Sequence, residues 1–310
     1  MEIFKERYLW AGFSLYVLCI CYLHFTFQIS LTDFLPAFMI LGIGFSFIAW
    51  WFTKAFPNPQ HRPLINYEAL AIAALIAWIV LYITYGSGFI NTFFPGKWLE
   101  NGQIATAIIF IKKLFVFVLI PFAVYKAAGF TLKDFGLRDT AVKCFDKKAL
   151  AVFAILSVAI LLFQYFLANG GKQLRKEHFS FMQVIIAAPL CFLYLFFDAG
   201  LIEEFFFRGL LQSRMGVLLK SKTGGIIVSA LIFGLVHAPG LYLRGAESEG
   251  MEEQMPFLFW TAYTVAYMSI AGIFLGVVYS KTKNLWLVMA IHAMVDLIPN
   301  LKEFIHTWHL

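Results

Sequence analysis

The stretch from Ala149 to Ala168 reads ALAVFAILSVAILLFQYFLA, and it decides the class of fold. It contains no charged residue, and about 20 mostly apolar residues are what one helix needs to cross the hydrocarbon core of a bilayer. Similar stretches recur along the chain. We therefore expect a membrane protein built from several spanning helices.

Composition extends this interpretation to the whole chain. Of its 310 residues, 61% are hydrophobic and only 14% are charged, whereas soluble domains average about half apolar and about a quarter charged. A soluble fold of this length could not bury so many Phe, Leu and Ile side chains. Composition therefore excludes a secreted disulfide scaffold, a disordered tail and a soluble nucleic-acid-binding protein.

The apolar stretches predict an all-α polytopic bundle of about 8–10 membrane helices around an intramembrane polar cavity. Residues 200–219 and 223–237 are shorter or more polar, which is typical of helices enclosed by others, and Asp198 is expected to cap the first of them. Lys112 and Lys113 interrupt one stretch, and we expect them to face the bundle interior or to snorkel. The predicted spans are 8–29, 34–53, 67–90, 103–125, 149–168, 179–198, 256–279 and 284–299.

The net charge of +6 lies in short clusters between the apolar stretches. If loops alternate sides from a cytoplasmic N-terminus, and if 200–219 does not cross fully, sixteen Lys and Arg residues fall on the inner side and six on the outer side. The positive-inside rule then favours a cytoplasmic N-terminus. Short loops and compact length favour a bacterial cytoplasmic (inner) membrane.

A basic linker at about 126–148 divides the chain. Before it, residues 1–128 are predicted to form an N-terminal transmembrane extension of about four helices. After it, residues 129–310 carry most of the ionisable side chains at apparent membrane depth. We therefore expect the second part to be the catalytic core.

Three short motifs in this second part carry those ionisable side chains. They read LIEEFFFRG at 201–209, FGLVH at 233–237 and HAMVD at 292–296. Ionisable groups inside membrane segments are costly and usually mark a polar cavity or a pathway. Glu204 and Arg208 are four residues apart and are expected to pair, whereas Glu203 is turned about 100° away and points elsewhere.

Each histidine has a partner one helical turn away. His292 and Asp296 share a face, so the carboxylate can set the tautomer of the imidazole. Phe233 precedes His237 by the same spacing, which places an aromatic ring one turn from that imidazole. Taken singly, a Glu–Arg pair is often a structural clamp and a lone histidine is often a packing residue. The conjunction of all three motifs favours a functional site.

One acid and two imidazoles suit the activation of water by general-base catalysis. Serine chemistry is disfavoured because no GxSxG motif is present, and aspartyl chemistry needs two converging carboxylates. The four cysteines form neither a metal-ligand pattern nor a disulfide framework. Zinc stays possible, since two His and one Glu would suffice as ligands, but HExxH is absent and we favour a site with no metal and no cofactor.

The ordered set EExxxR, FxxxH and HxxxD resembles the CAAX prenyl endopeptidase and bacteriocin-processing family, also called Abi or CPBP, whose members are glutamate-dependent intramembrane proteases. The sequence Phe207-Arg208-Gly209 matches the usual FRG of that family, and Phe135-Gly136-Leu137-Arg138 is similar to a short element that often precedes its core. The resemblance covers about residues 130–300.

The resemblance implies a role for each motif residue. Glu203 would be the catalytic acid that activates water together with His237, and His292 with Asp296 would stabilise the oxyanion. Many members of the family carry Asn at the last position, and an ionised Asp only accepts hydrogen bonds, so Asp296 is either protonated or orients His292. By the same resemblance, the supporting residues would be Glu204 and Arg208, while spacing adds Phe233 beside His237.

The resemblance thus implies an intramembrane endopeptidase that cuts a membrane-associated peptide or a lipid-anchored protein in the bilayer, with no nucleic-acid partner. Two alternatives stay open. One is a non-catalytic membrane scaffold or bacteriocin-immunity protein of the same fold. The other is a proton-coupled transporter, which the absence of an evident repeat disfavours.

Overall fold

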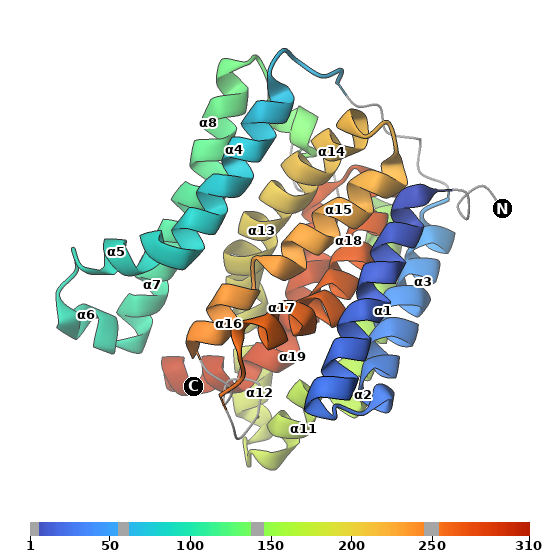
Figure 1. Cartoon of the computed structure of the whole chain (residues 1–310). Coiled ribbons are helices and arrows are strands. Elements are labelled where there is room, and N and C mark those ends of the chain that lie inside the picture. The colour runs from blue at the N-terminus through green and yellow to red at the C-terminus, as the bar shows by residue number, and fades with distance from the viewer. Residues whose placement is uncertain (1–5, 55–61, 138–145, 245–253) are drawn as a thin grey trace. The chain divides into compact units, whose positions relative to one another are not determined.

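The computed structural model of the chain describes residues 6–54, 62–137, 146–244 and 254–310 (Figure 1). Within these residues every regular element is a helix, and nine helical segments are long and apolar enough to cross a membrane. The predicted all-α membrane fold is therefore confirmed. The nine segments are Arg7–Phe27, Leu31–Phe52, Glu68–Asn91, Gly102–Ala127, Lys147–Phe166, Phe181–Leu218, Lys222–Leu243, Phe257–Thr282 and Leu285–Trp308.

One prediction about these segments is wrong. Residues 179–198 and 200–219 were expected to be two helices with Asp198 as the cap between them, but Phe181–Leu218 is one continuous helical segment. The π-helical turns η6 (Phe196–Leu201) carry the backbone through Gly200 without a break, and Asp198 lies inside them. Glycine weakens a helix interior, which is why the sequence suggested an end there.

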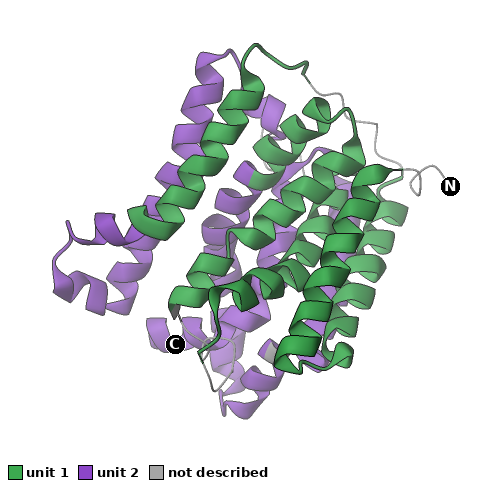
Figure 2. Cartoon of the chain, in the orientation of Figure 1, with its two compact units in different colours: residues 1–86, 207–282 green, residues 87–206, 283–310 purple. Residues whose placement is uncertain are grey.

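The described chain divides into two compact units, each built from segments that are far apart in the sequence (Figure 2). Unit 1 comprises residues 1–86 and 207–282, and unit 2 comprises residues 87–206 and 283–310. This division does not test the predicted extension at 1–128, which stays a prediction together with the core at 129–310. Lys5, Arg138, Lys143, Cys144 and the acidic stretch around 247–253 lie outside the described residues.

Unit 1 is drawn in green in Figure 2. Its helices are α1 (Arg7–Phe27), α2 (Leu31–Leu35), η2 (Pro36–Gly44), α3 (Phe45–Phe52), α4 (Glu68–Leu81), η3 (Tyr82–Gly86), most of η7 (Phe205–Gln212), α14 (Ser213–Leu218), α15 (Lys222–Leu235), α16 (Ala238–Arg244), α17 (Phe257–Ala266) and α18 (Met268–Thr282). Within the unit, α15 packs on α18, and α1 packs on both α15 and α17.

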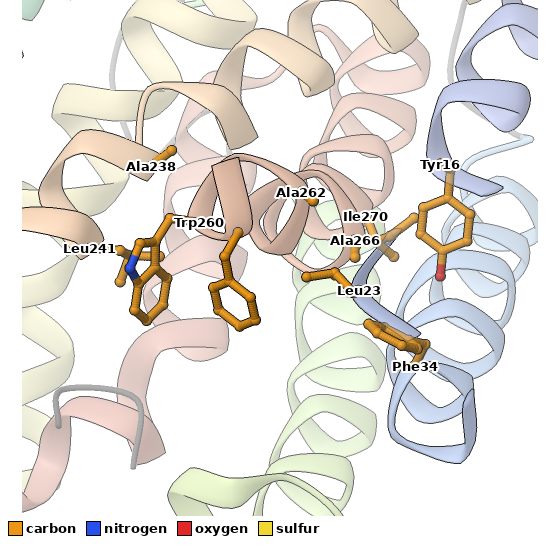
Figure 3. Close-up of a cluster of buried hydrophobic side chains, with 10 residues drawn as sticks. Tyr16, Leu23, Phe34, Ala238, Leu241, Trp260, Ala262, Ala266 and Ile270 are labelled. Carbon is orange, nitrogen blue, oxygen red and sulfur yellow. The ribbon is translucent and has the colours of Figure 1, made fainter. Parts of the chain in front are cut away.

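An apolar cluster fills the interior of unit 1 (Figure 3). Leu23 of α1, Phe34 of α2 and Trp260 of α17 are almost fully buried in it. Close packing also requires a small residue in α15, because a Cβ on Gly234 would lie 2.7 Å from the carbonyl oxygen of Thr264. Lipid tails are as apolar as these side chains, so van der Waals packing between the helices is what holds them together.

A buried ion pair joins the start of α4 to α14 in unit 1. Arg214 bonds the Glu68 carboxylate through two nitrogens, and its Nη2 lies 2.8 Å from Glu68 Oε2. The same guanidinium donates to the backbone carbonyls of Arg62 and Pro63, at 2.8 and 2.9 Å. Arginine is suited to such planar, forked contacts. Both charged side chains are buried and their charges are matched.

Unit 2 is drawn in purple in Figure 2. Its helices are α5 (Ser87–Asn91), α6 (Gly96–Glu100), α7 (Gly102–Lys113), η4 (Leu114–Leu119), α8 (Ile120–Ala127), η5 (Leu132–Phe135), α10 (Lys147–Phe166), α11 (Asn169–Lys176), α12 (Phe181–Leu195), η6, α13 (Ile202–Glu204) and α19 (Leu285–Trp308). Within it, α19 packs on α10, α12 and η6.

Side chains at the helix starts of unit 2 define where its spans begin. Asp146 accepts from the backbone N–H of Ala149 at 2.8 Å and begins α10. Ser180 and Gln183 form a reciprocal capping box at the start of α12. Such caps satisfy backbone donors that have no partner inside the helix.

The two lysines of the fourth predicted span are both accommodated inside unit 2. Lys112 Nζ donates to Asn91 Oδ1 at 2.6 Å and to Ser87 Oγ at 3.3 Å, and its side chain is buried. Lys113 Nζ pairs with Asp198 Oδ2 at 2.8 Å. Of the two expected outcomes, an interior position or snorkelling, the structure shows an interior position for Lys112, whereas Lys113 is half-buried and has Asp198 as its counter-ion.

Candidate active site

Unit 2 brings the first and third motifs together. Glu204 lies in α13 and His292 lies in α19, and Glu204 Oε1 is 2.6 Å from His292 Nδ1. Glu204 is fully buried and His292 is 4% exposed. A charge-assisted contact of this length in a buried setting fixes both side chains.

Asp296 engages the other nitrogen of the same ring. Its Oδ2 lies 3.3 Å from His292 Nε2, one helical turn along α19, as the spacing predicted. An ionised carboxylate can only accept hydrogen bonds. When Glu204 and Asp296 are both ionised, each ring nitrogen must therefore carry a proton, and His292 is then an imidazolium held between two carboxylates.

A close backbone approach permits this arrangement. A Cβ on Gly200 would lie 2.8 Å from the carbonyl oxygen of Met289, so η6 and α19 touch at a residue without a side chain. Met289 lies one turn before His292, and Gly200 lies one turn before Glu204. Since a larger residue would push the helices apart, Gly200 is one condition of the Glu204–His292 contact.

Glu203 is the residue before Glu204 in α13, and its side chain is half-buried. Successive residues of a helix point about 100° apart. Glu203 and Glu204 therefore point in different directions, as the sequence predicted.

Unit 1 holds the second motif. His237 Nδ1 lies 2.6 Å from the carbonyl oxygen of Phe233, and the two rings lie with their centroids 4.9 Å apart. A carbonyl oxygen only accepts, so Nδ1 carries the proton of this hydrogen bond. In the neutral ring, Nε2 is then the nitrogen that can accept a proton.

Arg208 supports that motif through the aromatic ring. Its guanidinium carbon lies 4.4 Å from the centre of the Phe233 ring, and its side chain is 1% exposed. This distance is that of a cation–π contact. Phe207 also meets Phe233 edge-on, with ring centroids 5.1 Å apart. The predicted ion pair between Glu204 and Arg208 stays a prediction.

The structure thus places the predicted residues in two separate groups, one in each unit. Unit 2 joins His292 to Glu204 and Asp296, and unit 1 joins His237 to Phe233 and, through that ring, to Arg208. A common cavity for Glu203 with both histidines stays a prediction. Within the described ranges no group of three or more His, Cys, Asp or Glu side chains is arranged to hold a metal ion, and the expectation of a site without metal also stays an expectation.

Sequence reasoning missed two contacts in unit 2. The Glu204–His292 contact links residues that are 88 positions apart, and spacing within a motif carries no information on it. The Lys113–Asp198 pair had a usable signal, because a lysine in one apolar span needs a partner and an acid stands in another.

Comparison with known proteins adds one finding. Residues 183–298 match the family model described as type II CAAX prenyl endopeptidase Rce1-like. The match contains all three motifs. No curated protein and no solved structure matches the chain.

Proposed function

Because residues 183–298 carry the Rce1-like type II CAAX prenyl endopeptidase family match, we propose that the chain is an intramembrane endopeptidase. It hydrolyses a peptide bond in a membrane-associated or lipid-anchored substrate. Water is the nucleophile, and Glu203 and His237 activate it.

The tautomer of His237 supports the role of base. The Phe233 carbonyl holds the proton on Nδ1, so in the neutral ring Nε2 is the basic nitrogen, and in this proposal it takes the proton from water. Glu203 is only half-buried, so packing does not enclose its side chain completely, and we propose that water reaches its carboxylate from the open side. A correctly placed general base contributes roughly 10²–10⁴-fold to a rate.

The surroundings of His292 support a role in stabilising the oxyanion through charge. A ring held between Glu204 and Asp296 carries protons on both nitrogens when both carboxylates are ionised, and a preorganised positive charge stabilises the negative charge of a tetrahedral intermediate. Asp296 then orients the ring from the Nε2 side. It takes this role in place of the Asn found in many members of the family.

One observation carries the proposal. The 2.6 Å contact between Glu204 and His292 joins the first and third motifs of the family match, although 88 residues separate them. This contact holds α13, which also carries Glu203, against the helix that carries His292 and Asp296, as a site built from both motifs requires.

Loss of the proposed bases tests the activity. We expect Glu203→Gln and His237→Ala each to lower peptide cleavage by about 100-fold or more, the size of a general-base contribution. The substrate is first identified by trapping it with the Glu203→Gln variant and analysing the co-purifying proteins by mass spectrometry. Cleavage of that substrate is then measured for each variant.

Glu100→Gln is the matched control, because Glu100 is exposed in α6, outside the three motifs, and it should cleave at the wild-type rate. Full cleavage by Glu203→Gln or His237→Ala removes the mechanism. If Glu203→Gln complements a deletion strain, the chain is a scaffold or an immunity protein instead.

A further inference from the structure

We propose that unit 2 carries a binding site for a bilayer aminolipid, with one acyl chain in an apolar groove and the amine head in an adjoining polar pocket. This site is separate from the proposed proteolysis and does not depend on it. The groove has a volume of about 570 Å³, within the range of pockets that enclose small organic ligands. Its walls come from α7, α12, η6 and α19, through Ala107, Phe110, Leu190, Leu193, Phe197 and Phe304.

A polar pocket of about 120 Å³ lies beside the groove. The two share wall residues, among them Thr106, Tyr194 and Phe304, so one molecule can occupy both. The pocket adds Asn300 and Glu303 from α19. An apolar space that continues into a small polar one matches an amphiphile with a chain and a head.

The ends of three helices meet beside the site. Gln103 near the start of α7 donates to the Thr307 carbonyl at 3.4 Å, and Gln183 near the start of α12 donates to the Leu310 carbonyl at 2.9 Å. The starts of α7 and α12 therefore lie together with the end of α19, at one face of the unit.

Along α7 the polar pocket ends at Thr106, whereas the groove continues to Phe110. Along α19 the polar pocket reaches inward to Asn300, whereas the groove reaches inward only to Phe304. The two spaces therefore lie side by side, each with its own extension beyond the shared wall.

The charges around the polar pocket indicate which lipid head group it favours. Glu303 supplies a carboxylate to the pocket, and none of the described residues that line it is Lys or Arg. Lys302, the nearest basic neighbour in sequence, is paired with Glu177 at 2.5 Å. Pockets that bind anionic head groups are basic, so this one favours an ammonium group that can donate hydrogen bonds to Glu303 and Asn300.

Lipid binding to the purified full-length chain tests the site. The delipidated protein in detergent is titrated with phosphatidylethanolamine, phosphatidylcholine or phosphatidylglycerol of identical acyl chains, and bound lipid is measured by native mass spectrometry. We expect phosphatidylethanolamine to bind about two- to fivefold more tightly than phosphatidylglycerol, the range of a solvent-exposed ion pair. Phosphatidylcholine should also bind less tightly, because its head has no N–H donor.

Two variants separate head from chain. Glu303→Gln should abolish the preference for phosphatidylethanolamine and leave chain binding, whereas Ala107→Trp should weaken all three lipids because it fills the groove from an exposed position. Glu100→Gln is the matched control and should keep the preference.

Equal binding of the three lipids overturns the proposal, as does a preference that survives Glu303→Gln. A preference for phosphatidylglycerol overturns it as well. Since binding is measured without cleavage, and can be repeated in the Glu203→Gln background, failure here is distinct from failure of the proposed protease.

Discussion

His292 is bounded by a carboxylate on each ring nitrogen, with Glu204 at 2.6 Å and Asp296 at 3.3 Å. The two acids are not equivalent, because Glu204 is fully buried whereas the Asp296 side chain is 30% exposed. The buried acid comes from another helix and holds α13 against α19. The more exposed acid comes from the same helix and acts on the ring alone.

Neutralising the buried acid should cost stability. We expect Glu204→Gln to lower the free energy of unfolding by roughly 1–3 kcal/mol, the cost of weakening a buried charged hydrogen bond. The measurement is the melting temperature of the purified protein in detergent. An unchanged melting temperature, with Glu100→Gln as reference, would contradict the importance of this contact.

Two of the three contacts predicted within a motif are found in the structure, the Glu204–Arg208 pair stays a prediction, and the contact between motifs was not predicted. The spacing of four residues predicted the His292–Asp296 and Phe233–His237 neighbours, and the structure confirms both. Helix geometry fixes such pairs locally. The Glu204–His292 contact depends on how two distant helices pack, so the sequence alone could not predict it.

At the scale of the element, η6 is the segment on which the site depends. Its π-helical turns carry Asp198, which pairs with Lys113, and Gly200, which meets the backbone of α19 at Met289. Turns of this kind inside α-helices are frequent at functional sites. Glu203 and Glu204 follow η6 after Ile202, so the position of η6 determines the direction of both acids.

Gly200→Ala tests this dependence. The added Cβ would lie 2.8 Å from the Met289 carbonyl oxygen, so η6 must move away from α19 and the Glu204–His292 contact must lengthen. We expect a loss of stability of about 1–3 kcal/mol from overpacking and a loss of cleavage activity, measured by thermal unfolding and by turnover of the trapped substrate.

Gly88→Ala is the matched control, since a Cβ at Gly88 meets nothing within 4 Å. It should leave both stability and turnover near wild type. If Gly200→Ala also behaves as wild type, the close approach at Met289 does not set the site.

The positions of the spanning helices were predictable because length and hydropathy alone determine them. The continuity of the helix through Asp198 was not predictable, because π-helical turns have no clear sequence signature. A polar residue followed by Ala199 and Gly200 is equally consistent with a cap.

In the whole molecule, segments that are far apart in the sequence pack together in one unit. Unit 1 takes its first segment from residues 1–86 and its second from 207–282. Hydropathy along the sequence reports where helices lie in the chain and not which helices pack together, so this interleaving could not be predicted. The Glu68–Arg214 pair is one bond between the two segments.

Breaking that pair should loosen unit 1. We expect Glu68→Ala to lower the free energy of unfolding by about 3–5 kcal/mol, because it leaves the buried Arg214 without its counter-charge. Thermal unfolding in detergent measures the loss. Glu100→Ala serves as the comparison at an exposed site, and an equal melting temperature for the two variants would show that the pair does not stabilise the unit.

The placement of α1 bears on how the chain is made. Its main packing partners are α15 and α17, and α15 begins 195 residues after α1 ends. Tyr16 of α1 also stacks on Phe38 of η2, in the helical segment that follows directly in the chain. Chains are synthesised from the N-terminus, so α1 must stay in the bilayer, with lipid on the face that later meets α15 and α17, until the ribosome has delivered both helices. The buried positions of α1 are Tyr16 and Leu23. Neither of them is charged, so the face of α1 that later packs against α15 and α17 can lie against lipid acyl chains until then without burying a charge.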